Sequence, residues 1–205
     1  MRIVMATNNA GKLREFRELL APLGFEVEPL SQFTRESAEE TGLSFIENAI
    51  LKARHAARAA NLPAIADDSG IEVDALRGEP GIYSARYAGE GASDQANLEK
   101  LLRAVADVPA AQRTARYQCA LAFMRFAADP SPLICQASWE GRVIMTPRGS
   151  GGFGYDPIFE LPEIGKTAAE LAPEEKNRIS HRGKALRELV ARLRAQQDEQ
   201  RVQSR

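Results

Sequence analysis

Strand-like and helix-like patterns alternate over the first third of the chain, and this alternation limits the fold more than any other feature. The segment RIVMAT (residues 2–7) is a β-branched apolar run typical of a buried strand, and NNAGK (8–12) interrupts it. Apolar residues then recur at helical spacing over residues 12–24 until a proline and a glycine end the pattern. The segment FEVEPL (25–30) predicts a half-exposed strand. Such alternation is typical of an α/β fold.

The next segments continue the alternation. A helix is predicted over residues 44–61, because its apolar residues form one stripe and Pro63 prevents its continuation. The segment AIADDSG (64–70) predicts a strand that ends at a Ser–Gly turn, and GIEVDAL (70–76) alternates apolar and acidic residues. The helix predicted over 94–106 has Ser93 as its N-cap.

The second half of the chain has a different pattern. Two longer strands, 115–127 and 132–145, are separated by a turn and are predicted to pair antiparallel. A glycine-dense loop follows at 147–159, and an amphipathic helix is predicted over 180–196. Helices alternating with strands and a later hairpin predict an α/β fold with a mixed sheet.

Length and composition are those of one ordinary globular domain. The chain has 205 residues, of which 44% are hydrophobic and 27% charged. We expect a single domain over residues 1–195 and a disordered tail over 196–205, where Val202 is the one apolar residue. Cys119 and Cys135 form no disulfide framework or zinc motif and are expected to be buried thiols.

Charge and the N-terminal segment exclude several classes of protein. The net charge of −1 and the pI near 6.2 argue against binding to nucleic acid through bulk positive charge. The segment MRIVMATNN is neither a signal peptide nor a membrane-spanning helix. We therefore expect a cytoplasmic protein that uses neither nucleic acid nor a membrane as its partner.

The segment TNNAGK (7–12) lies where a strand pattern changes to a helix pattern. A helix N-terminus offers unpaired N–H groups, while Gly11 lets a ligand approach the backbone and Lys12 adds a full charge. This pattern predicts a phosphate-binding loop, although an ordinary strand-to-helix turn is the alternative. It is not a Walker A loop, which would need glycine and a hydroxyl residue in place of Ala6 and Leu13.

Two adjacent carboxylates, Asp67 and Asp68, follow a run of small apolar residues. Neighbouring side chains of an extended strand point to opposite faces, so these two do not form a carboxylate pair while the strand continues. Asp68 adjoins the expected turn at Ser69 and Gly70, at the sheet edge that binds ligands in α/β folds. Asp68 is therefore a candidate Mg²⁺ ligand, with a turn-capping role as the alternative.

Other candidates lie before the second helix and near the end of the chain. Glu39 or Glu40 could be a second metal carboxylate, or could merely complement the helix dipole. In the glycine-dense loop, two aromatic rings could stack on a base and an aspartate could accept a hydrogen bond from it, unless the rings pack into the core. Lys176, His181 and Arg182 gather ahead of the last helix, where cations and free N–H groups could bind an anion or a base carbonyl.

Six segments occur together in one order: TNNAGK, SAEETGLSFIENAILKA, AIADDSG, PGIYSARY, GGFGYDPIF and EEKNRISHRGKAL. Taken together they strongly resemble the Ham1 family, the inosine triphosphate pyrophosphatases that act on non-standard purine nucleotides. The resemblance runs from about Ile3 to Leu193. It implies a two-lobed α/β fold with a central mixed sheet flanked by helices, a cleft between the lobes and a homodimer.

The resemblance also implies Mg²⁺-dependent hydrolysis of ITP, dITP and XTP to the monophosphate and pyrophosphate. Asp68 matches the proton acceptor and metal ligand of the family, Glu39 matches its metal-linked glutamate with Glu40 as the alternative, and Ser69 adjoins the substrate. The triphosphate loop, which reads GN at its middle in many members and NN here, comprises Thr7, Asn8, Asn9, Ala10, Gly11 and Lys12. The remaining substrate-binding positions are Phe153, Gly154, Tyr155, Asp156, Lys176, His181 and Arg182.

Two other classes of function are weighed against this one. A septum-inhibitor (Maf)-like pyrophosphatase would prefer pyrimidine or modified nucleotides, and the segments GFGYDPIF and SHR disfavour it. A nucleotide-sensing module would bind a triphosphate without turnover, and the acids at Glu39 and Asp68 argue against that role.

Overall fold

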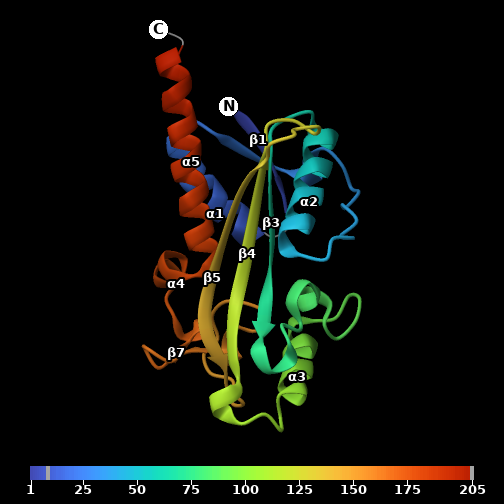
Figure 1. The fold of residues 1–205 in the computed structure, drawn as a ribbon, viewed down its shortest axis with the longest axis vertical. Coiled ribbons are helices and arrows are strands. Elements are labelled where there is room, and N and C mark those ends of the chain that lie inside the picture. The colour runs from blue at the N-terminus through green and yellow to red at the C-terminus, as the bar shows by residue number, and fades with distance from the viewer. Residues whose placement is uncertain (8–9, 204–205) are drawn as a thin grey trace. The chain divides into compact units, whose positions relative to one another are not determined.

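The computed structural model describes residues 1–7 and 10–203 and has the α/β architecture that the sequence predicts (Figure 1). Its strands are β1 (Arg2–Ala6), β2 (Glu26–Pro29), β3 (Ala64–Val73), β4 (Thr114–Met124), β5 (Leu133–Val143), β6 (Phe159–Leu161) and β7 (Lys166–Thr167). Its α-helices are α1 (Ala10–Leu20), α2 (Phe45–Ala60), α3 (Asp94–Ala104), α4 (Pro173–Ile179) and α5 (His181–Gln203). A 3₁₀ helix, η4 (Gly81–Arg86), lies between β3 and α3.

The seven strands form one sheet in the order β2-β1-β3-β4-β5-β6-β7. Strand β1 pairs in parallel with β2 and with β3, whereas β6 pairs antiparallel with β5 and with β7. The mixed sheet predicted from the sequence is therefore confirmed. The parallel part comes from the strand–helix alternation of the N-terminal segments, because parallel neighbours require a crossover connection.

The chain divides into two compact units. Unit 1 comprises Met1–Asp68, Ala120–Gln136 and Ala185–Arg205, and unit 2 comprises Ser69–Cys119 and Ala137–Lys184. The long strands β3, β4 and β5 and the helix α5 each contribute residues to both units.

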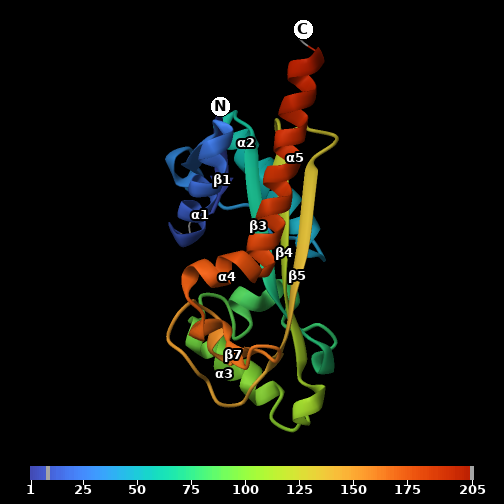
Figure 2. The same cartoon turned by 90° about the vertical axis from the view of Figure 1, so that its left-hand side faces the viewer.

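In unit 1, helices cover both faces of the sheet. Figures 1 and 2 show α2 on one side of β1 and β3, with α1 and α5 on the other side. The helix α2 starts at its N-cap Ser44, whose side chain accepts a hydrogen bond from the N–H of Glu47, and Glu47 in turn accepts one from the N–H of Leu43. Its inner face is largely alanine, so the helix packs closely against the sheet.

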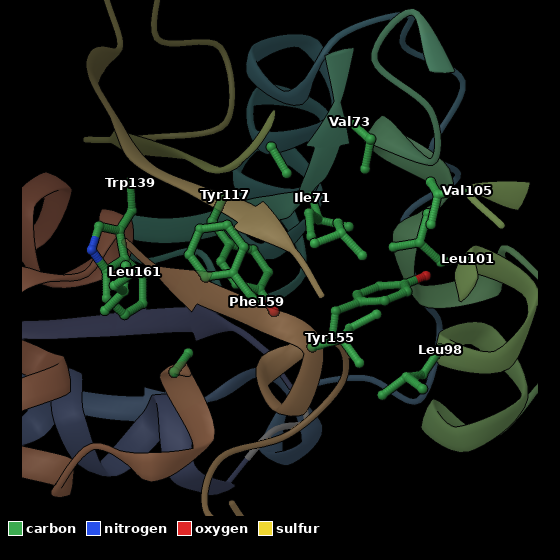
Figure 3. Close-up of a cluster of buried hydrophobic side chains, with 14 of the residues drawn as sticks. Ile71, Val73, Leu98, Leu101, Val105, Tyr117, Trp139, Tyr155, Phe159 and Leu161 are labelled. Atoms are coloured by element: carbon green, nitrogen blue, oxygen red, sulfur yellow. The ribbon is translucent and has the colours of Figure 1, made fainter. Parts of the chain in front are cut away.

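The core of unit 2 is richer in aromatic residues. Tyr117, Trp139 and Phe159 pack together, and Tyr155 joins them beside the leucines of α3 (Figure 3). The helix α3 begins at the predicted N-cap Ser93, whose side chain accepts a hydrogen bond from Ala96 N–H at 3.2 Å.

The predicted secondary structure is wrong at one turn and lacks three short elements. Strand β3 continues through Ser69 and Gly70 without a turn, because these small residues are extended in the middle of a largely buried strand. The strands β6 and β7 were not predicted, since strands of two or three residues carry no readable period. The seven-residue helix α4 was not predicted either. Helix α5 continues to Gln203, into the segment for which a tail was predicted.

Two simpler expectations can be compared directly with the structure. Cys119 and Cys135 are both buried and form no disulfide among the described residues, as predicted. Within residues 1–7 and 10–203, no helix is both long and apolar enough to cross a membrane.

Candidate active site

The predicted phosphate loop leaves the sheet beside the two aspartates. The register of the parallel strands pairs Ala6 with Ala66, so Thr7, just after the end of β1, lies level with Asp67, whereas β3 itself continues to Val73. Lys12, in the first turns of α1, donates a hydrogen bond to Asp67 Oδ1 at 2.8 Å. Of the other predicted loop residues, Ala10 and Gly11 begin α1, and Asn8 and Asn9 lie outside the described residues.

Asp68 points to the opposite side of the strand from Asp67. Its Oδ1 accepts a hydrogen bond from Lys52 Nζ at 2.6 Å, and Lys52 belongs to α2. Because successive side chains of a strand alternate between faces, Asp67 meets the lysine of α1 and Asp68 meets the lysine of α2. The prediction that the two carboxylates do not form a pair is confirmed.

Lys52 also contacts a second carboxylate, and so lies between two acidic side chains. Its Nζ lies 3.2 Å from Glu40 Oε1, whereas the neighbouring Glu39 is exposed. Burial raises the pKa of the Asp68 carboxyl, and the charge of Lys52 opposes that shift. Burial lowers the pKa of Lys52, but its attraction to Asp68 and Glu40 outweighs this effect and leaves the pKa above its ordinary value. Lys52 therefore stays cationic between two carboxylates.

The residues around Asp68 fit a hard divalent cation. The second oxygen of Asp68, Oδ2, is buried and makes no hydrogen bond to any described residue. A buried carboxylate oxygen without a partner is unfavourable, and a cation would satisfy it. The described part of the chain contains no group of three or more acidic, histidine or cysteine ligands. Water and phosphate oxygens would have to complete the coordination, as Mg²⁺ prefers.

In unit 2, Asp156 organises the glycine-dense loop. Its carboxylate accepts hydrogen bonds from Phe153 N–H at 2.8 Å, from Tyr117 Oη at 3.2 Å and from Lys176 Nζ. A Cβ atom at Gly152, where φ is +73°, would lie 2.0 Å from Asp156 Oδ2. Glycine at this position therefore leaves the space that the carboxylate fills.

The two aromatic residues of this loop have different roles. Phe153 is about half exposed, and its ring lies under two cations, Lys176 Nζ at 5.0 Å and Arg182 Cζ at 5.6 Å from the ring centre. Tyr155 is buried, and its hydroxyl donates to Ser84 O at 2.7 Å. In this structure Phe153 presents a ring to solvent, whereas Tyr155 anchors the loop to the core as in the alternative weighed above.

The start of α5 carries the last two predicted residues. Ser180 Oγ accepts a hydrogen bond from Gly183 N–H at 3.2 Å, as an N-cap would. The buried His181 ring stacks on Tyr117 with centres 4.8 Å apart and planes 12° apart. Arg182 Nη2 donates to Ser69 Oγ at 3.3 Å. Unit 2 thus brings together Ser69, Phe153, Asp156, Lys176, His181 and Arg182 through these contacts.

Sequence reasoning missed Lys52 and Tyr117, which contact the predicted residues directly. Lys52 could have been found from the predicted helix, because it lies three residues after Ala49, which belongs to the predicted buried stripe. Tyr117 had no comparable signal, since its partners are distant in sequence.

Comparisons with known proteins identify the family to which these motifs point. The family model of the Ham1 family matches residues 3–192. A dITP/XTP pyrophosphatase from Thioalkalivibrio sulfidiphilus is 62% identical over 193 residues, which cover 94% of this chain and 98% of that protein. The dITP/XTP pyrophosphatase of Escherichia coli K12 is 58% identical over the same shares of both chains.

Solved structures give the same result. A HAM1 protein from Coxiella burnetii superposes with a TM-score of 0.91 at 48% identity, covering 95% of this chain and 99% of that one. The Ham1 protein of Staphylococcus aureus has a TM-score of 0.88 at 43% identity, covering 96% and 100%. Both superpositions extend over nearly the entire fold.

Proposed function

This chain belongs to the Ham1 family, and from that premise we propose that it is a nucleoside triphosphate pyrophosphatase. It hydrolyses non-standard purine nucleoside triphosphates (ITP, dITP and XTP) to the monophosphate and pyrophosphate, and thereby removes deaminated purines from the nucleotide pool. Relatives about 60% identical over almost their full length are named dITP/XTP pyrophosphatases. The structural observation that carries the proposal is Asp68, with one oxygen bonded to Lys52 and the other buried without a hydrogen bond from any described residue.

The phosphate end of the substrate is assigned to unit 1. Asp68 and one of the adjacent glutamates would hold Mg²⁺, and the contact through Lys52 favours Glu40 over Glu39. Bound Mg²⁺ would neutralise charge on the phosphate oxygens. Lys12, with the first amides of α1, binds phosphate and stabilises the charge that develops as pyrophosphate leaves. Asp68 orients the water that attacks the α-phosphorus, or accepts its proton.

The base end is assigned to unit 2. Phe153 offers a ring face for stacking, and its two cationic neighbours and Asp156 offer donors and an acceptor. Hypoxanthine and xanthine present an oxygen at position 6, where adenine presents an amino group. A mismatch that leaves a buried polar group unpaired costs about 1–3 kcal/mol, so several such contacts select strongly against adenine.

Asp68→Asn tests the proposal in the presence of Mg²⁺ and a panel of nucleoside triphosphates. The wild type should release pyrophosphate, and not orthophosphate, from ITP, dITP and XTP. Asp68→Asn should lower kcat/KM by about a thousandfold. Asp74→Asn is the control, because Asp74 lies on a half-exposed surface and accepts hydrogen bonds from Arg116 and Thr114, which are not site residues. Near-normal kcat in Asp68→Asn, or a preference for pyrimidine substrates, would contradict the proposal.

The partner and the compartment are also proposed. The protein acts on free nucleotides and not on nucleic acid, forms a homodimer and works in the cytoplasm. The family resemblance supports the dimer, and the net charge of −1 supports free nucleotides over nucleic acid as the substrate. Light scattering during size-exclusion chromatography should give twice the chain mass of 22.5 kDa.

A further inference from the structure

Tyr117 lies on β4, outside all of the six segments that resemble the family. It contacts Asp156 and His181, two of the predicted substrate-binding residues. We propose that Tyr117 is a positioning residue that holds Asp156 and His181 in place and thereby sets the preference for purines with a hydrogen at N1 over adenine. This inference rests on the proposed function, because it assigns the base to the residues of unit 2.

The first contact is the hydrogen bond from the Tyr117 hydroxyl to Asp156 Oδ1, at 3.2 Å between two buried side chains. Asp156 Oδ2 already accepts bonds from Phe153 N–H and Lys176 Nζ. A carboxylate oxygen can accept two hydrogen bonds, so Tyr117 occupies one acceptor position of Oδ1 and fixes the direction of the other. That remaining position can accept the N1–H of hypoxanthine or xanthine, whereas N1 of adenine is itself an acceptor and is repelled.

The hydroxyl remains a donor over the working range of pH. Burial and the nearby Asp156 charge raise the pKa of Tyr117 well above its ordinary value. The phenol is therefore protonated at neutral pH. A neutral donor beside a carboxylate fixes its orientation without cancelling its charge.

The second contact is made by the face of the ring. The His181 ring stacks on Tyr117 at 4.8 Å, and on its indole neighbour Trp139 at 6.2 Å. Because His181 is the first residue of α5, the stack also places Arg182, which contacts Ser69 and the ring of Phe153. One tyrosine thus supports both the loop and the helix that carry the base-facing groups.

A purely structural role for Tyr117 makes a different prediction. The residue is part of the aromatic core with Phe159 and Trp139 (Figure 3), so removal of its ring would disturb packing in general. Tyr117→Phe keeps the ring and its stacking contacts with His181 and Trp139, and removes only the hydroxyl. A packing role predicts equal effects on all substrates, whereas a positioning role predicts a change in base preference.

The test compares kcat/KM for ITP and for ATP in wild type, Tyr117→Phe and Tyr87→Phe. Tyr87 is the matched control, because its hydroxyl also lies near a carboxylate, that of Glu79 at 3.5 Å, on the exposed surface of unit 2. Tyr117→Phe should reduce the ITP-to-ATP ratio about tenfold, through a higher KM for ITP with kcat within about twofold of wild type. Tyr87→Phe should leave the ratio unchanged. An unchanged ratio in Tyr117→Phe, or equal losses with both substrates, overturns the inference.

Binding measurements separate this inference from the proposed function. Calorimetry with ITP and ATP in the presence of EDTA reports base preference without turnover. If the wild type prefers ITP in binding but releases no pyrophosphate with Mg²⁺, the proposed function fails and the role of Tyr117 can still be measured in Tyr117→Phe. If the wild type binds ITP and ATP equally, or if Tyr117→Phe keeps the wild-type preference, the inference is overturned. Tyr117→Leu, which also removes the stack on His181, should lose more ITP affinity than Tyr117→Phe.

Discussion

Asp67 and Asp68 of β3 are neighbours in the chain but differ in their contacts. Asp67 and Asp68 are adjacent and both buried, yet each pairs with a lysine from a different helix. The alternation of strand side chains explains this division. Of the two, Asp68 alone keeps a buried oxygen without a hydrogen bond among the described residues. Of these two residues we therefore propose Asp68 as the metal ligand.

Two adjacent glutamates provide a matched pair of variants. Glu40→Gln should lower kcat with ITP and raise the Mg²⁺ concentration needed for half-maximal activity, by about tenfold or more. Glu39→Gln should change either quantity by less than about twofold, because Glu39 is exposed and Lys52 pairs with Glu40. A magnesium titration of initial rates distinguishes the two. If Glu39→Gln has the larger effect, the metal assignment returns to the residue that the family resemblance indicates.

The turn between β4 and β5 illustrates how an element is stabilised by one buried acid. Asp129 accepts hydrogen bonds from Arg125 N, Arg125 Nε and Ser131 N at 2.8–3.0 Å, and pairs with the Arg125 guanidinium. These bonds, led by those from the Arg125 side chain, lower the pKa of Asp129 below its ordinary value. A group whose pKa is lower when folded stabilises the protein above its unfolded pKa and loses that effect as pH falls.

Asp129→Asn should therefore destabilise the protein by about 1 kcal/mol at pH 7, since Arg125 is largely exposed and can be rehydrated. The difference in the free energy of unfolding from wild type should be constant above about pH 5 and shrink below about pH 4. Urea unfolding across this range measures it. Asp107→Asn, at an exposed position, serves as the control. A difference that grows with acidity would contradict the assignment.

At the scale of the whole molecule, catalysis and folding should depend differently on metal. The described residues include no group of three or more side chains that could hold a metal ion, and we predict that the free energy of unfolding does not depend on one. EDTA should abolish pyrophosphate release and change Tm by less than about 2 °C, and added Mg²⁺ should restore the activity. Thermal unfolding followed by circular dichroism, with and without EDTA, checks this. Loss of secondary structure on chelation would indicate a structural metal instead.

Most of the fold could be predicted because local patterns carry it. The helices α2 and α3 follow from apolar periodicity, and the N-cap of α3 follows from Ser93. The turn at Ser69 and Gly70 was wrong for the same reason, because small residues signal a turn locally while β3 continues as a strand within the sheet. Periodicity and turn residues describe the neighbourhood of a residue in the chain and not the strands beside it.

The sequence was sufficient for the fold class and for the order of the longer elements, because these depend on periodicity and on short motifs. It could not assign the directions of side chains on irregular segments. Whether Glu40 or Glu39 meets Lys52, and whether Phe153 or Tyr155 is exposed, depends on partners such as Ser84 that are distant in sequence. Tertiary packing alone makes that choice, because in a loop no regular backbone geometry determines where the next side chain points.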